Sequence, residues 1–167
     1  MIILEREKQL KNLGVTFDEY MSWVKHTNTV CKAYSSLRTL YRFKRFLSVS
    51  AKKSLCESLV LSHFNYCDGL FLNLTKVLFD KIQKVQNACV RFIYNLRKYD
   101  RDHIKPYILE LGWLNMYNRR MLHSYTMMYK VDMKLAPQYL IDLIPRNRDI
   151  HNYNTRSANN FRNLKSN

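Results

Sequence analysis

Glycine and proline are scarce in this chain, each occurring only three times in 167 residues. Turns between β-strands draw on these two residues, so their scarcity disfavours a sheet-rich sandwich or barrel and favours helices joined by short loops. Long apolar runs are absent as well, because no stretch approaches the roughly twenty residues that span a bilayer. The N-terminal MIIL is too short for a signal peptide, since Glu5 follows it at once. We therefore predict an intracellular protein with no membrane partner.

Catalytic and metal-binding motifs are also missing from the sequence. With so few glycines, neither a P-loop nor a dinucleotide-binding glycine pattern can be built, and no Asp-Asp pair is present to hold two metal ions for nucleotidyl transfer. The four cysteines form no C-x-x-C pair and are interpreted as reduced thiols. His63 and Cys67 stand four residues apart, but no second pair completes a zinc site. We expect no catalytic residue, no metal site and no cofactor in this chain.

Positive charge, in contrast, is abundant: 28 Lys and Arg against 13 Asp and Glu give a formal net charge of +15. The excess is regional, because the stretch from Tyr34 to Lys53 has six basic side chains and no acidic one. The commonest partners of such a surface are nucleic acid and anionic membrane, and a solvated basic face without a partner is the simpler alternative. Hydrophobic residues make up 47% of the chain, enough for a folded core.

Apolar residues recur every three or four positions, which predicts a mainly α fold, a helical bundle of about four to six helices with a short N-terminal β-strand. The strand is expected where Leu13, Val15 and Phe17 alternate with Gly14 and Thr16, and MIIL is the only partner offered to it. The helices are expected at 22–46, 50–66, 76–96, 106–111, 116–131 and 137–144. Three regions follow, namely the strand region 1–21, a helical domain 22–145 and a basic flexible tail 146–167.

Helix ends and core positions can be assigned within this pattern. The expected N-caps are Ser22, Ser50, Thr75 and Asn115, and Gly112 is the expected C-cap. Positions expected to face the core include Leu55, Leu59 and Phe64 of the second helix, Val77, Leu78, Ile82, Val85, Ala88, Cys89, Phe92 and Ile93 of the third, and Met116, Leu122, Tyr125 or Thr126, and Tyr129 of the fifth.

Basic residues gather on the solvent side of the first helix, at the start of the second and in a pair on the fifth. The candidate nucleic-acid-binding residues are Lys25, Lys32, Arg38, Arg42, Arg45, Lys52, Lys53, Arg119 and Arg120. Such side chains contact phosphates without reading bases. Helical phase directs Tyr41 inward and leaves Phe43 as the better candidate for an exposed ring that stacks on a base.

Several stretches together resemble a known family. They are LGVTFDEYMSWVKHTNTVCKAYSSLRTLYRF, LVLSHFNYCDGLF, KIQKVQNACVRFIYNL, LELGWLNMYNRRMLHSYTMMYKV and LAPQYL. In this order and spacing they resemble the C-terminal part of reverse transcriptases encoded by non-LTR retrotransposons of the jockey and CR1 type. The resemblance covers Leu10 to Leu143, and it departs from relatives at Asn115, where they often have proline.

The resemblance implies that Leu13 to Val15 close the palm just after the polymerase active site and that the following helices form the thumb, with the basic residues facing RNA or an RNA–DNA hybrid. The catalytic Asp-Asp motif of that family lies upstream of anything present here, so the chain is expected to be inactive alone, and Mg²⁺ is expected only for the missing catalytic domain. The missing palm and fingers of the same polyprotein are a second expected partner, and the cytoplasm, the nucleus or both the expected location. The alternatives are a small helical docking module and a non-functional remnant of a transposable element.

Overall fold

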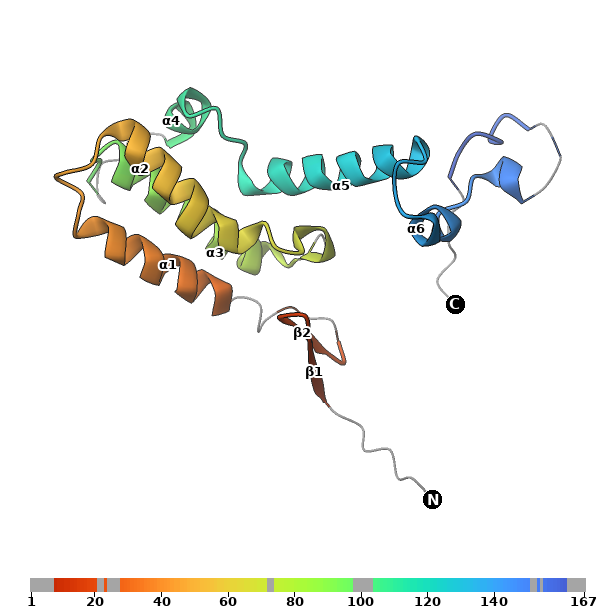
Figure 1. The fold of residues 1–167 in the computed structure, drawn as a ribbon, viewed down its shortest axis with the longest axis horizontal. Coiled ribbons are helices and arrows are strands. Elements are labelled where there is room, and N and C mark those ends of the chain that lie inside the picture. The colour runs from red at the N-terminus through yellow and green to blue at the C-terminus, as the bar shows by residue number, and fades with distance from the viewer. Residues whose placement is uncertain are drawn as a thin grey trace, which may run out of the picture. The chain divides into compact units, whose positions relative to one another are not determined.

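The computed structural model describes residues 8–20, 23, 28–71, 74–97, 104–150, 153 and 155–161. It confirms a mainly α fold with a short antiparallel sheet near the N-terminus (Figure 1). The chain divides into two compact units, Met1–Met121 and Leu122–Asn167. This division lies inside a helix. Within the described segments, no helix combines the length and apolarity needed to cross a bilayer.

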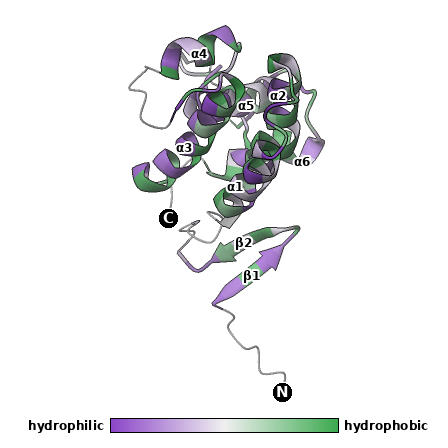
Figure 2. Ribbon diagram, turned by 90° about the vertical axis from the view of Figure 1, so that its left-hand side faces the viewer, coloured by the Kyte–Doolittle hydropathy of each residue, from purple (hydrophilic) through white to green (hydrophobic). Residues whose placement is uncertain are grey.

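The N-terminal strands form a hairpin. β1 (Gln9–Asn12) pairs antiparallel with β2 (Val15–Asp18), and Leu13 and Gly14 make the turn with φ of 45° and 84°. Two left-handed residues give the turn a twist that suits a hairpin, and Gly14 adopts this backbone without a Cβ clash. The predicted strand start at Leu13 is therefore wrong. The structure gives β2 the partner β1, and the predicted partner MIIL lies outside the described residues. β1 is exposed along its length and mostly hydrophilic (Figure 2).

The first helix, α1 (Asn28–Tyr41), ends five residues before the predicted Phe46. Its predicted beginning at Ser22 lies outside the described residues. Beyond Tyr41 the chain continues as tight turns whose amides bond three residues back, such as Phe43 N to Leu40 O at 3.0 Å. The apolar face of α1, which includes Ala33 and Leu37, is buried against the neighbouring helices.

The second helix, α2 (Val49–Leu55), begins at Ser48, whose hydroxyl accepts a hydrogen bond from the amide of Ala51 at 3.2 Å. The predicted cap at Ser50 is therefore wrong by two residues. The helix runs on through a π-helical turn, Cys56–Val60, and a 3₁₀ turn, Leu61–Phe64. The extra residue of the π turn shifts the helical phase, so Leu59 is exposed, contrary to expectation, while its neighbour Val60 is buried.

The third helix, α3 (Lys76–Ile93), is the centre of the first unit and packs against α1, α2 and α4. Figure 1 shows α1, α2 and α3 side by side. Its inner stripe matches the prediction except at Val77, which is 66% exposed. Thr75 stands at the N-cap position as expected. A separate small cluster joins Val15, Trp23 and Phe71, the last from a 3₁₀ turn at Asp68–Phe71, and thereby fixes the hairpin.

Two further helices follow in the first unit. α4 (Ile104–Glu110) ends as predicted at Gly112, which has a φ of 68°. α5 (Met116–Asp132) begins at the predicted cap Asn115, whose amide oxygen accepts a hydrogen bond from Asn118 N at 2.7 Å. The side chain of Gln83, on α3, accepts a second bond from Met116 N at 3.0 Å. The start of α5 is therefore held by α3 as well as by its own cap.

The second unit contains the rest of α5, then α6 (Gln138–Leu143), and a 3₁₀ turn at Asn147–Asp149. A β-bridge joins Arg146 to Phe161, and Arg146 also pairs with Asp132. The described residues of the predicted flexible tail therefore carry local structure, because one arginine connects the tail to α5 and to its own end.

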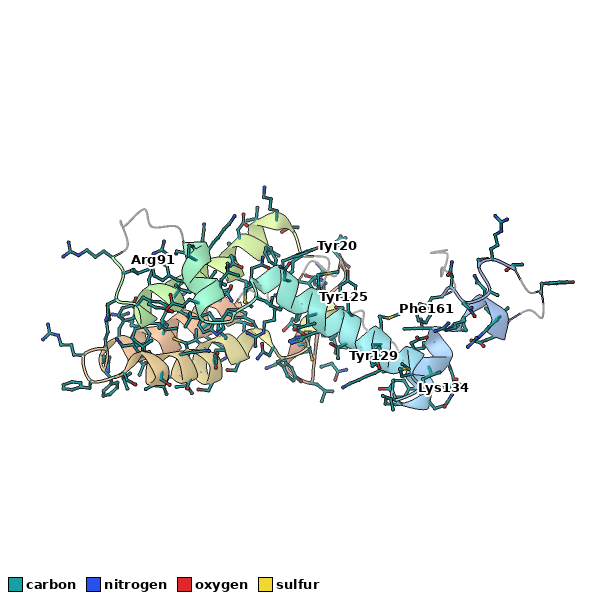
Figure 3. The ribbon with its side chains drawn as sticks, turned by 90° about the horizontal axis from the view of Figure 1, so that it is seen from above. Tyr20, Arg91, Tyr125, Tyr129, Lys134 and Phe161 are labelled. Carbon is teal, nitrogen blue, oxygen red and sulfur yellow. The ribbon has the colours of Figure 1, made fainter. Side chains whose placement is uncertain are left out.

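One predicted face of α5 is wrong. The prediction places Leu122, Tyr125 or Thr126, and Tyr129 on the core side. Leu122, Tyr125 and Tyr129 are instead 51%, 63% and 57% exposed, and Thr126 is exposed as well. Tyr125 and Tyr129 project from the helix in Figure 3. Periodicity identified a real apolar row, but nothing in the described part of the second unit covers it.

The contact between Lys52 and Asn95 predicts a measurable loss of stability. Lys52 is 3% exposed, its ammonium donates to Asn95 Oδ1 at 3.1 Å, and it lies 5.7 Å from the centre of the Phe92 ring. We expect Lys52→Ala to lower the free energy of unfolding by about 2 kcal/mol, because a buried hydrogen bond to a charged group is lost. Urea denaturation followed by circular dichroism measures the change.

Lys53→Ala is the matched control, because this neighbouring lysine is only half-buried and makes no such bond to any residue that the structure describes. It should change stability by less than about 0.5 kcal/mol. Equal losses in the two variants would show that the contact with Asn95 does not stabilise the fold.

Candidate nucleic-acid interface

A groove of about 670 Å³ lies between α1 and α3. The lining side chains are basic, aromatic, amide or aliphatic, and none of the described residues that line it is acidic. They are Tyr34, Leu37, Arg38 and Tyr41 of α1, Lys84, Asn87, Ala88 and Arg91 of α3, and Leu96 beyond it. The groove exists because both helices bury their apolar stripes against each other and leave polar residues along the seam.

Three basic side chains line this groove. Arg38 comes from α1, while Lys84 and Arg91 stand seven residues, or two turns, apart on α3. Arg91 extends from the last turn of α3, where a positive charge is favoured by the helix dipole (Figure 3). Since no carboxylate among the described residues lines the groove, its described lining is positively charged.

Two tyrosines complete the groove. Partial burial raises the pKa of Tyr34 and of Tyr41, the buried thiol of Cys89 adds to the rise, and the positive charge of Arg91 acts in the opposite direction. Both phenols therefore stay protonated at neutral pH and offer O–H donors beside the cations. The ring of Tyr41 also meets Phe92 edge-on, with centroids 5.0 Å apart, but Tyr41 remains 43% exposed, so the expected inward packing is only partly right.

The turn that follows α1 extends the basic surface. Arg42 and Arg45 are exposed in it, and the ammonium of Lys44 lies 5.5 Å from the centre of the Tyr41 ring, which itself lines the groove. Phe43 is 54% exposed, as the sequence predicted. From Thr29 to Cys56 the sequence contains no acidic residue, so groove and turn form one basic surface.

The other candidate residues that the structure describes do not all line the groove. Lys25 is outside the described residues, Lys32 is exposed on α1 without lining the groove, Lys53 is half-buried on α2, and Arg119 is half-buried on α5. Only Arg38 of the predicted set lines the groove itself, and Arg42 and Arg45 adjoin it.

Lys52 and Arg120 are buried, so we no longer consider them candidates for binding nucleic acid. Arg120 is 4% exposed, donates to the carbonyl of Phe71 at 3.4 Å and lies 5.8 Å from the centre of the Phe79 ring. Burial lowers its pKa, and the carboxylate of Asp68 acts in the opposite direction. Both cations bind inside the protein, where a phosphate backbone does not reach them.

The sequence did not lead us to Lys84 or Arg91 as groove residues, or to Tyr34 as a hydrogen-bond donor in the groove. The signal was present in the spacing of Lys84 and Arg91, which brings two cations to the same edge of the buried stripe of α3. Their approach to Arg38 depends on how α1 packs on α3, which no local pattern shows.

A second hollow, of about 780 Å³, lies between α3, α4 and the start of α5 and shares Asn87 and Arg91 with the groove. It is lined mainly by apolar and amide side chains, with Lys105 and Arg91 as its cations. Its apolar character makes it a poorer site for an anion than the groove between α1 and α3. Among the described residues, no group of three or more His, Cys, Asp or Glu is placed to hold a metal ion.

No protein-family model matches the chain, and no curated protein or solved structure matches it. The functional proposal therefore depends on the groove and on the sequence pattern.

The burial of Tyr41 predicts a pH dependence of stability. Because its folded-state pKa is above the ordinary value of 10.0, stability is full below pH 10.0 and is lost as the pH rises through the folded-state pKa. We expect Tyr41→Phe to reduce the drop in unfolding free energy between neutral and strongly alkaline pH. Urea denaturation at a series of pH values measures this drop.

Tyr20→Phe is the control, because Tyr20 is 81% exposed. The drop in unfolding free energy between neutral and strongly alkaline pH should be the same for this variant as for the unchanged chain. If Tyr41→Phe behaves in the same way as this control, the Tyr41 phenol is not desolvated in the groove.

Proposed function

We propose that this chain binds the phosphate backbone of RNA or of an RNA–DNA hybrid along the groove between α1 and α3, as the thumb region of a non-LTR retrotransposon reverse transcriptase. The observation that carries the proposal is the convergence of Arg38, Lys84 and Arg91 on one groove whose described lining contains no acidic residue. The sequence resemblance supports the same placement, because its thumb segment includes α1 and α3.

The chemistry of the groove suits a backbone more than a base sequence. Guanidinium and ammonium groups bind phosphate oxygens, and phenol and amide groups add hydrogen bonds to phosphate or ribose. These contacts do not read base identity, so we expect affinity governed by charge and shape. The proposed role is to hold template and primer, and the chemistry of polymerisation belongs to the upstream residues that the resemblance implies.

Salt dependence tests the groove. We expect binding of a labelled RNA–DNA hybrid, followed by fluorescence anisotropy, to weaken by about 10³ to 10⁵ between 50 and 200 mM salt if six to ten phosphates are contacted. Changing Arg38, Lys84 and Arg91 together to Glu should weaken binding at least about tenfold and flatten the log–log salt slope by about 3. Circular dichroism checks that the variant remains helical.

The control changes three exposed lysines outside the groove, Lys11, Lys76 and Lys81, to Glu. Both triple variants lose the same formal charge, so a general loss of positive charge would weaken both equally. Equal weakening would reject the groove as the binding site. A primer-extension assay with Mg²⁺ addresses the second half of the proposal, because extension by this chain alone would contradict its assignment as a non-catalytic thumb.

The exposed row on α5 favours a second candidate function, docking onto a protein partner such as the palm of the same polyprotein. Leu122, Tyr125 and Tyr129 stand on successive turns of one helix, and each is at least half exposed. Exposed apolar patches of this kind mark protein-binding surfaces.

Dye binding tests the exposed row. We expect changing Leu122, Tyr125 and Tyr129 together to Ser to lower the fluorescence of a bound hydrophobic dye severalfold, because the dye loses its apolar surface. A palm fragment added to the unchanged chain should lower it likewise. Tyr20→Ser removes a ring that is 81% exposed and does not belong to the row, and it should have no effect. If the palm fragment leaves dye binding unchanged, the docking role is wrong.

A further inference from the structure

Two phenylalanine rings stand in solvent at the turn Arg42–Phe46, between α1 and α2. Phe46 is 86% exposed and Phe43 54% exposed. Rings of this size normally pack inside a protein or bind a partner, because their apolar faces are poorly hydrated. The exposure of Phe46 is the largest of any large hydrophobic side chain that the structure describes.

The exposure is built into the backbone. Amides in the turn bond to carbonyls three residues back, including Phe46 N to Phe43 O at 2.9 Å. The next residue, Leu47, packs against the core, and Ser48 caps α2. The core therefore takes the apolar side chain beside Phe46 and leaves Phe46 itself outside.

The far end of the turn is also anchored. α2 is joined near its start to the end of α3 by the bond from Lys52 to Asn95, and Asn95 has a left-handed backbone with a φ of 58°. Because the turn is fixed at both ends, its backbone already presents the two rings to solvent before any ligand arrives. A preorganised backbone loses little conformational freedom on binding.

Cations alternate with the two rings. Arg42, Lys44 and Arg45 stand between and beside Phe43 and Phe46, and no acidic residue occurs in the turn. Proteins that bind single-stranded nucleic acid combine basic groups for the backbone with aromatic rings on which bases stack. Lys44 lies over the ring of Tyr41, so this charged turn is continuous with the groove.

We propose that Phe46 stacks on an unpaired nucleotide at the point where a single strand leaves the duplex held in the groove, with Phe43 as a second ring. The inference deepens the proposed function and rests on it. It assigns the chain a preferred ligand, a hybrid with a single-stranded overhang. A stacked base needs a ring face that solvent can reach, and Phe46 offers one beside three phosphate-binding cations.

The experiment compares a blunt RNA–DNA hybrid with the same hybrid carrying a short single-stranded overhang, by fluorescence anisotropy at fixed salt. We expect the unchanged chain to bind the overhang hybrid about tenfold more tightly, and Phe46→Ala to remove that advantage while changing blunt binding less than about twofold. Phe46→Trp should keep the advantage, because indole also stacks. Phe46→Leu should lose the advantage, because leucine is apolar but has no ring on which a base can stack.

A direct readout of stacking accompanies the affinities. A 2-aminopurine placed as the first unpaired base should have its fluorescence changed on binding by the unchanged chain and not by Phe46→Ala. Because Phe46 is exposed, its substitution should leave the helical circular dichroism unchanged. A loss that is equal for blunt and overhang hybrids, or no loss at all, would overturn the inference.

Two further comparisons distinguish this inference from the groove proposal and from membrane binding. An overhang advantage that depends on Phe46 and persists when Arg38, Lys84 and Arg91 are changed to Glu would support stacking even if the groove proposal failed. Vesicles containing phosphatidylserine test the other anionic surface that a basic aromatic turn fits. Vesicle binding that requires Phe46, with overhang binding unaffected, would assign the turn to a membrane surface and overturn the inference.

Discussion

The buried stripe of α3 is the constraint on which the first unit depends. This stripe includes Val85, Cys89 and Phe92, which are all fully buried. The helix that carries them packs against α1, α2 and α4. A helix turns by 100° per residue, so a stripe this wide leaves Lys84 and Arg91 at its edge and not on its outer face. Edge residues are the ones that meet a neighbouring helix, and for this reason the cations of α3 line a groove instead of standing alone in solvent.

The same packing decides which charges remain available to a ligand. Lys52 and Arg120 count toward the net charge of +15 as much as Arg38 does, but each binds groups inside the protein. Lys52 holds the end of α3, and Arg120 holds the carbonyl of Phe71. A surplus of basic residues therefore serves two purposes here, since part of it stabilises the fold and only the rest shapes the surface.

Local patterns predicted most of the helices because their signals are short in range. The stripe of α3, the cap at Asn115 and the end at Gly112 depend on residues within a few positions of each other. The hairpin was missed because the Leu13 to Val15 stretch was interpreted as one strand, whereas Gly14 makes a turn possible at its centre. Ser48 and Ser50 are equally good caps by type, and the choice between them depends on Leu47 reaching the core.

The groove could be predicted only in part for the same reason. Arg38 was identified from its own helix, but its partners Lys84 and Arg91 stand far along the chain and approach it only through tertiary packing. The exposed row of α5 shows the opposite error, because periodicity shows that residues share a face without showing that anything covers that face.

The π-helical turn at Cys56–Val60 has a consequence for how related chains should be compared. It accommodates one residue more than a regular helix would over the same length, and this surplus is what turns Leu59 outward and Val60 inward. A chain with one residue fewer at this place would keep the same inward positions on an unbroken α-helix. A single-residue gap opposite this turn would thus mark an insertion absorbed within a conserved helix, with the residues on both sides still equivalent in space.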